Sequence, residues 1–223
     1  MSITDNIKQV LTQIENEHRP VCLLAVSKGQ SLAKIEEAIT AGLTHFGENY
    51  VQEALPKIAA LSKYTLTWHF IGPIQSNKAK AIATHFQWVQ SVDRLNVAKK
   101  LNDCRPTHLP PLNVCIQVNI DNESSKSGVM PDDLLPLATA ILQCPKLKLR
   151  GIMAIPAPKT SADEACKTFM VLNHLMAQLS AALNYPLDTL SMGMSDDYIP
   201  ALKAGATLIR LGSCLFGARE GLY

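Results

Sequence analysis

Val21-Cys22-Leu23-Leu24-Ala25-Val26-Ser27-Lys28 is a short apolar run that ends on a lysine, and residues 31–42 (SLAKIEEAITAG) follow it. A continuous apolar run of this length is typical of a strand that is buried on both faces. In the following segment Ser31 can cap a helix that ends at Gly42, a residue type suited to the position just after a helix. Together these residues predict a β-strand followed by an α-helix.

The same unit recurs along the chain. Apolar runs that predict strands begin at Val21, His45, Thr67, Trp88, Leu112, Leu147, Thr189 and Leu208. Between them lie helical patterns, with Asp93 as a cap, Pro131 in a first turn, and a long pattern from Ser161 to about Leu183.

Strands that alternate with crossover helices form a parallel sheet with right-handed connections. We predict a single α/β domain over residues 1–223, a (β/α)8 TIM barrel of ordinary length for this fold. The segment from Ile3 to His18 has apolar residues at helical spacing and predicts an extra N-terminal helix. The structural alternative is an open, doubly wound sheet.

Composition excludes several functional classes. The chain has 223 residues, of which 47% are hydrophobic and 18% charged, with a net charge of +2. So mild a charge without a basic block argues against a nucleic-acid partner. The six cysteines include no CxxC unit, so we expect no metal site and reduced thiols. No apolar run approaches the roughly 20 residues of a membrane span, and the first residues lack a signal peptide's apolar region, so we expect a cytoplasmic protein without membrane contact.

In a closed barrel of this kind the active site forms at the C-terminal ends of the strands. Lys28 closes an otherwise apolar strand, where partial desolvation would lower its pKa and expose a nucleophilic amine able to form a Schiff base. Taken alone, Lys28 is better interpreted as a lysine whose stem lies on the strand while its ammonium reaches solvent.

The seventh and eighth predicted strands lead into small-residue turns. Gly193 and Ser195 precede a helix that Ser195 can cap, and Gly212-Ser213 forms a second turn. The loops after strands seven and eight of such barrels often bind phosphate through backbone N–H groups, although two ordinary turns explain the residues equally well. Any phosphate there requires Asp196 and Asp197 to point away from it.

Arg210 is the third candidate. It lies inside an apolar strand, where a charge needs a partner, either a structural salt bridge or a ligand atom. Asn49 and His69 can line the same barrel mouth, although a histidine satisfied within the core is the commoner case. A lysine, a phosphate cradle and an arginine together suit a phosphorylated carbonyl ligand, either pyridoxal 5′-phosphate (PLP) or the phosphosugar of a lysine-dependent aldolase.

At these residues the sequence resembles the pyridoxal phosphate homeostasis protein family over nearly its whole length. The matching segments are residues 25–28 (AVSK), 45–53 (HFGENYVQE), 68–78 (WHFIGPIQSNK), 151–155 (GIMAI), 191–197 (SMGMSDD), 209–213 (IRLGS) and 216–219 (FGAR).

The resemblance implies a barrel like the N-terminal domain of alanine racemase, with PLP held as a Schiff base on Lys28. It further implies that Arg210 contacts the pyridine nitrogen and that Ser195, Gly212 and Ser213 hold the phosphate. Asn49, from its predicted place at the same mouth, is a further expected cofactor-binding residue. The family often has Thr at the position of Ser213, and either hydroxyl can donate to a phosphate oxygen. An arginine at the ring nitrogen does not protonate it, which makes the cofactor a poorer electron sink.

The resemblance therefore implies a non-catalytic protein of intracellular PLP (vitamin B6) and amino-acid homeostasis, with PLP-requiring apo-enzymes as possible recipients. The chain stops soon after its eighth strand, so we expect it to lack the second domain from which racemases take another acid/base, and to be a monomer. The alternative is a PLP-dependent racemase-like enzyme with that base supplied from within the barrel. Roles for His69 and Asn119 stay open.

Overall fold

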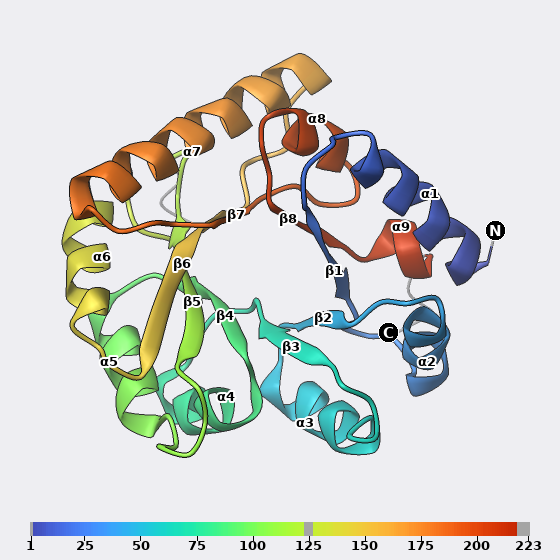
Figure 1. The fold of residues 1–223 in the computed structure, drawn as a ribbon, viewed down its shortest axis with the longest axis horizontal. Coiled ribbons are helices and arrows are strands. Elements are labelled where there is room, and N and C mark those ends of the chain that lie inside the picture. Colours follow the sequence, from blue (N-terminus) through green and yellow to red (C-terminus); the bar gives the residue numbers. More distant parts are fainter. Residues whose placement is uncertain (1, 123–126, 218–223) are drawn as a thin grey trace.

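Eight parallel strands form a closed barrel in the order β1-β2-β3-β4-β5-β6-β7-β8 (Figure 1). The computed structural model describes residues 2–122 and 127–217. Its strands are β1 (Cys22–Val26), β2 (His45–Glu48), β3 (Thr67–Phe70), β4 (Trp88–Val92), β5 (Leu112–Val118), β6 (Leu147–Ala154), β7 (Thr189–Ser191) and β8 (Leu208–Leu211). Every strand after the first begins at the predicted residue, and β1 begins one residue later. Because β1 pairs with β8, the barrel is confirmed and the open sheet is wrong.

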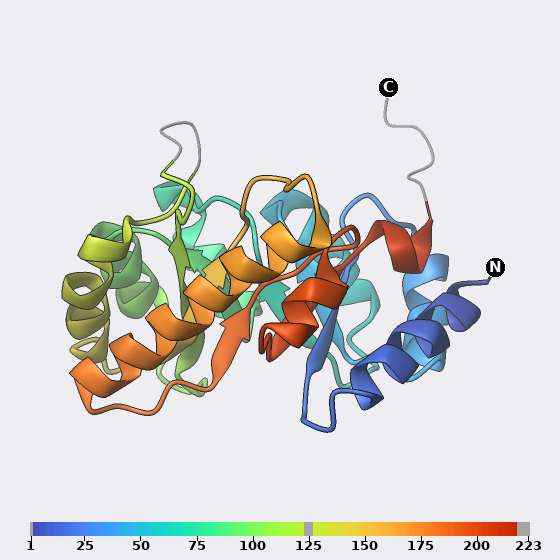
Figure 2. The same ribbon diagram turned by 90° about the horizontal axis from the view of Figure 1, so that it is seen from above.

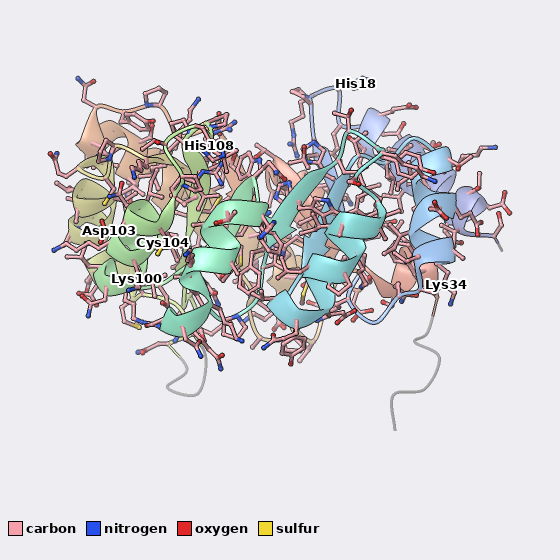
Figure 3. The ribbon with its side chains drawn as sticks, turned by 90° about the horizontal axis from the view of Figure 1, so that it is seen from below. His18, Lys34, Lys100, Asp103, Cys104 and His108 are labelled. Carbon is pink, nitrogen blue, oxygen red and sulfur yellow. The ribbon has the colours of Figure 1, made fainter. Side chains whose placement is uncertain are left out.

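Helices surround the ring of strands (Figure 1). The α-helices are α1 (Ile3–Glu15), α2 (Leu32–Thr40), α3 (Val51–Ala60), α4 (Ala79–His85), α5 (Leu95–Cys104), α6 (Leu134–Leu142), α7 (Ala162–Leu183), α8 (Tyr198–Lys203) and α9 (Ser213–Phe216), with short 3₁₀ helices η1 (Ser76–Lys78) and η2 (Pro131–Asp133). Figure 3 shows Lys100 and Asp103 on the outer side of α5, where both are exposed. The helices thus turn their charged faces outward and their apolar faces toward the barrel.

The hydrogen bonds at the helix ends show which of the predicted cap residues are correct. The side-chain oxygens of Ser31 and Ser161 accept hydrogen bonds from the backbone N–H groups of Lys34 and Glu164, so both caps are confirmed. Gly42 follows α2 with a φ of +97°, a conformation that favours glycine. The Asp93 cap is wrong, because the Asp93 carboxylate instead accepts a hydrogen bond from the Arg94 guanidinium at 2.6 Å.

Helix α1 covers the outer side of the barrel where β8 meets β1. It buries Ile3, Ile7, Val10 and Ile14, and it ends at Glu15 rather than at the predicted His18. It contacts α2 and α9, and the Asn6 amide donates to the Leu215 carbonyl at 3.0 Å (Figures 1 and 2). Since α9 is a single turn, α1 supplies the apolar cover that a full eighth helix would give, with each fully buried isoleucine contributing about 1.5–3 kcal/mol.

Candidate functional site

A cavity of about 670 Å³ lies at the C-terminal ends of the strands, where barrels of this kind carry their active sites. All six residues predicted to bind a cofactor lie in its lining. The lining consists of Val26, Lys28, Gln30, Asn49, Ile71, Gly72, Pro73, Ile155, Met194, Ser195, Asp196, Arg210, Gly212, Ser213 and Gly217. Lys28 and Ser213, which lie near opposite ends of the sequence, therefore meet at one mouth.

Lys28 follows the end of β1 and is partly buried. The backbone on both sides of it is fixed by charged groups. The Lys57 ammonium donates to the Ser27 carbonyl at 2.7 Å, and the Gly29 N–H donates to the Glu53 carboxylate at 2.5 Å. The turn that carries the Lys28 amine is thereby attached to helix α3.

This attachment belongs to a buried charge cluster that the sequence analysis missed. The Lys57 ammonium lies 2.8 Å from Glu48 and 2.6 Å from Glu53, and the Ser27 hydroxyl donates to Glu48 at 2.6 Å. Burial raises the pKa of Glu48, against the opposing effects of Lys57 and Ser27. A lysine four residues after Glu53 on a helix was the available signal for one pair, but Glu48 joins through the fold.

The predicted phosphate turns lie together, but through contacts other than those expected. Ser195 does not cap α8, because Asp197 precedes that helix and makes no side-chain cap. The Ser195 hydroxyl instead accepts from the backbone N–H groups of Gly212 at 3.4 Å and Cys214 at 3.3 Å. The Asp197 carboxylate is engaged by the Met194 N–H at 2.6 Å, whereas Asp196 remains in the cavity lining.

Two glycines allow the loops of this mouth to approach closely. A Cβ at Gly72 would collide with the Asn49 carbonyl. Gly193 has a φ of +88°, and a Cβ there would lie 2.5 Å from that of Ala201. The neighbouring Asn49 has a buried Oδ1 that lacks a hydrogen-bond partner within the described part of the chain, which marks the Asn49 side chain as able to take a ligand hydrogen bond.

Arg210 lies on β8 with an exposed fraction of 4%. Its guanidinium donates to the Ser191 hydroxyl at 2.7 Å and to the Ala154 carbonyl at 2.8 Å. Within residues 2–122 and 127–217 it therefore has neutral partners, and the salt-bridge alternative is wrong. Burial lowers the pKa of Arg210 to about 10, which still leaves the group cationic at neutral pH.

His69 does not line this mouth. It is fully buried and borders a second cavity, also of about 670 Å³, at the N-terminal ends of the strands. Gln90 and Ser191 are also buried inside the barrel, and neither was predicted, because a single polar residue within an apolar strand carries no signal of its own. Asn119 is buried after β5, where its N–H donates to the Val129 carbonyl at 2.9 Å.

Other kinds of site find no support in the described residues. They contain no group of three or more histidine, cysteine, aspartate or glutamate residues that could hold a metal ion. All six cysteines are free. No helix within these ranges has both the length and the apolar character needed to cross a membrane.

The closed parallel barrel with a cavity at its C-terminal mouth places the protein in the class of (β/α)8 barrels with a ligand site at that mouth. The family model "Alanine racemase, N-terminal domain" matches residues 2–220, and the chain belongs to this family, within the group of pyridoxal phosphate homeostasis proteins. The chain is 52% identical to the protein of that name from Pseudomonas aeruginosa, over 98% of this chain and 96% of the relative. The Escherichia coli K12 protein of the same name is 47% identical, over 98% and 94%.

Solved structures agree with this assignment. PipY of Synechococcus elongatus PCC7942, solved with PLP bound, superimposes with a TM-score of 0.87 at 36% identity, over 97% of this chain and 100% of that one. Alanine racemase of Clostridium difficile superimposes with a TM-score of 0.74 at 13% identity, over 98% of this chain and 58% of that one. At that identity the racemase shares the fold alone.

Proposed function

We propose that this protein binds PLP at the C-terminal mouth of its barrel and acts in the cytoplasm in PLP (vitamin B6) and amino-acid homeostasis. The observation that carries the proposal is the cavity itself, which gathers an amine, a guanidinium and two small-residue turns in one lining. The relatives named pyridoxal phosphate homeostasis protein and the PLP-bound PipY support the choice of PLP over a phosphosugar.

The residues of the cavity fit the parts of this cofactor. Lys28 would carry the aldehyde carbon as a Schiff base, and Ser195, Gly212 and Ser213 would hold the phosphate with hydroxyl and backbone N–H groups. Asn49 would satisfy its orphaned Oδ1 against the ligand or a water beside it. Bound PLP supplies an electron-accepting ring, and Arg210 at the ring nitrogen would limit that capacity because its proton stays on the guanidinium.

A carrier role is the better fit for this lining. Among the described residues that line the cavity, Lys28 and Asp196 are the candidates for proton transfer, and no histidine or tyrosine is present. A racemase needs a second acid/base on the face opposite Lys28. We therefore propose a protein that holds PLP and exchanges it with PLP-requiring apo-enzymes, as a monomer of one domain.

Borohydride reduction of the PLP-treated protein, followed by peptide mass spectrometry, tests the binding proposal. We expect a pyridoxyl adduct on Lys28 and its loss in Lys28→Ala, while Lys34→Ala on the outer helix α2 keeps the adduct. The absence of an adduct on Lys28 in the wild-type protein would contradict the proposal that PLP binds there.

Two further measurements separate carrier from enzyme. PLP transfer from the loaded protein to a PLP-requiring apo-enzyme, compared with free PLP at equal concentration, tests delivery. Solvent deuterium exchange at the α-carbon of common amino acids tests racemase-like chemistry, and Lys28-dependent exchange would contradict the carrier role. Analytical ultracentrifugation of the PLP-loaded protein tests the proposal that it is a monomer in solution.

A further inference from the structure

A chain of hydrogen bonds crosses the interior of the barrel from one mouth to the other. It starts at Arg210, whose guanidinium donates to the Ser191 hydroxyl at 2.7 Å, and Ser191 donates to Gln90 Oε1 at 2.6 Å. Gln90 Nε2 lies 2.9 Å from His69 Nδ1, and His69 Nε2 lies 2.9 Å from His45 Nδ1. The first four side chains are buried, and His45 borders the cavity at the N-terminal mouth.

The direction of the bonds in this chain follows from its first member together with the need of the buried Ser191 proton for an acceptor. A guanidinium donates hydrogen bonds and never accepts them, so Ser191 accepts from Arg210 and has its own proton free for Gln90 Oε1. The Gln90 amide then turns its NH₂ group to His69 Nδ1, which must be the acceptor. His69 accordingly carries its proton on Nε2 and donates it to His45 Nδ1, which leaves the His45 proton on Nε2.

The surroundings favour neutral rings at both histidines. Burial lowers the pKa of His45 and moves the pKa of His69 well below its ordinary value, and the nearby His45 adds to the effect at His69. The other ionisable groups that line this mouth are Cys22, whose pKa burial raises to about 11, and the ion pair of Arg150 with Asp188. A protonated His45 would therefore face a cation on β6 as well as a carboxylate before β7.

We propose that Ser191, Gln90 and His69 are positioning residues for Arg210, and that this chain couples the guanidinium at the ligand cavity to the tautomer of His45 at the opposite mouth. The proposal rests on the proposed function, because the guanidinium would donate to the ring nitrogen of PLP when the cofactor is bound. It assigns Gln90 and Ser191 a task that burial alone does not explain, since an apolar pair would fill the same interior.

Reversing the direction of the hydrogen bonds between His45 and Ser191 would leave one buried group unsatisfied. A proton on His45 Nδ1 would turn His69 Nε2 into an acceptor, place the His69 proton on Nδ1 and rotate Gln90 so that its NH₂ faces Ser191. Ser191 would then accept from both neighbours, and its own buried proton would lack an acceptor along the chain. Acidification at the N-terminal mouth thus leaves the hydroxyl that accepts from Arg210 with an unsatisfied buried proton, which destabilises the arrangement that holds the guanidinium.

Histidine ¹⁵N NMR on the unloaded protein tests the direction of the chain without PLP. We expect His69 and His45 as neutral Nε2–H tautomers at neutral pH, assigned by loss of each signal in single histidine variants. A His69 with its proton on Nδ1, or a charged His69, would overturn the proposal.

PLP titration followed by absorbance tests the positioning role. Ser191→Ala and Gln90→Leu should bind about tenfold more weakly, since each releases one support of a charge-assisted contact, and should shift the absorption band of the bound cofactor. Ser191→Thr keeps a hydroxyl and should restore binding. The matched control is Thr189→Val on the same strand, which removes a hydroxyl that donates to the Asp188 carboxylate. This variant should bind PLP within about twofold of wild type.

The outcomes of the two experiments distinguish the proposals. If wild type carries PLP on Lys28 while Ser191→Ala and Gln90→Leu match it in affinity and spectrum, the positioning role is wrong. If wild type forms no adduct, the proposed function fails, and the NMR tautomers still decide whether the chain runs as stated. Affinity measured against pH adds a third readout, because the decline on acidification should be smaller in Gln90→Leu than in wild type.

Discussion

The two mouths of the barrel enclose cavities of the same volume, about 670 Å³ each, but their polar groups differ in kind. At the N-terminal mouth, Arg150 binds Asp188 through several hydrogen bonds of 2.8–3.0 Å and lies over the Trp88 ring at 4.6 Å. At the C-terminal mouth, Asn49 keeps a buried oxygen without a described partner, and the hydrogen bonds that Arg210 makes within the described residues go to neutral groups. One mouth is satisfied by the protein, and the other has hydrogen-bonding capacity left for a ligand.

This difference shows that volume alone does not identify a binding site. A void lined by charges that pair with one another contributes to stability, whereas a void lined by incompletely satisfied groups is prepared for a partner. The general division of labour in such barrels, with stability at the N-terminal face and activity at the C-terminal face, follows here from particular contacts. Substitutions can break or sharpen that comparison.

The largest effect should come from Lys57→Met, which removes the cation that supports the Lys28 turn. Glu48 is fully buried and would lose its charged partner, so we expect a loss of about 3–5 kcal/mol in the free energy of unfolding. Urea unfolding measures it. Lys63→Met, which breaks an exposed pair with Glu36, is the matched control and should change little. Equal effects of the two variants would mean that the buried cluster does not support the mouth.

Next in size is the contrast between two arginines, one at each mouth. Arg210→Met should weaken PLP binding about a hundredfold, because it removes a buried charge-assisted contact, with little loss of stability. Arg150→Met should do the reverse, lowering stability through the lost Asp188 pair while PLP binding stays within about twofold. Titration and urea unfolding of both variants give the result, and a large binding defect in Arg150→Met would abolish the comparison.

Much of this architecture could be predicted from the sequence, because strands buried on both faces leave continuous apolar runs. The apolar runs predicted the first residues of β2 to β8, and the alternation of strands with helices predicted the closed barrel. The six cavity residues could be chosen because the C-terminal ends of the strands of a closed barrel meet at one face. Their roles came from the family resemblance, since Lys28 alone was better interpreted as a lysine reaching solvent.

The missed features all depend on register or on tertiary contacts. Whether His69 points into the barrel, and toward which mouth, depends on a strand register that its sequence neighbours do not encode. Gln90 and Ser191 form a chain only because side chains of β4 and β7 meet inside the closed barrel. The prediction of Ser195 as a helix cap was wrong because its hydroxyl accepts hydrogen bonds from the backbone N–H groups of Gly212 and Cys214 instead. These residues are close to Ser195 in the fold but distant in the sequence.

A smaller effect should appear in the pH dependence of stability. In the folded protein the pKa values of His45 and His69 are lower than the ordinary value of 6.5. Below pH 6.5 the unfolded chain therefore binds more protons than the folded one. Stability should therefore fall as the pH decreases from 6.5, by at most about 1.4 kcal/mol per pH unit for each histidine.

Unfolding of wild type and His45→Asn between about pH 5 and 7 isolates this contribution. Glu48 acts in the opposite direction, because its raised pKa makes stability fall as the pH increases above 4.5, so the comparison of the two proteins is more informative than wild type alone. We expect a shallower acid decline in His45→Asn. Parallel curves would show that the N-terminal mouth does not hold its histidine neutral.

The smallest effect should come from Ser213→Thr at the C-terminal mouth. Ser213 is exposed, and its replacement keeps the hydroxyl that is proposed to reach the phosphate, so PLP affinity should stay within about twofold. Ser213→Ala removes the donor and should weaken binding about threefold to tenfold, as expected for one hydrogen bond. Titration of both variants separates the hydroxyl from the backbone: if alanine binds as well as threonine, the phosphate is held by the N–H groups of the turn rather than by this side chain.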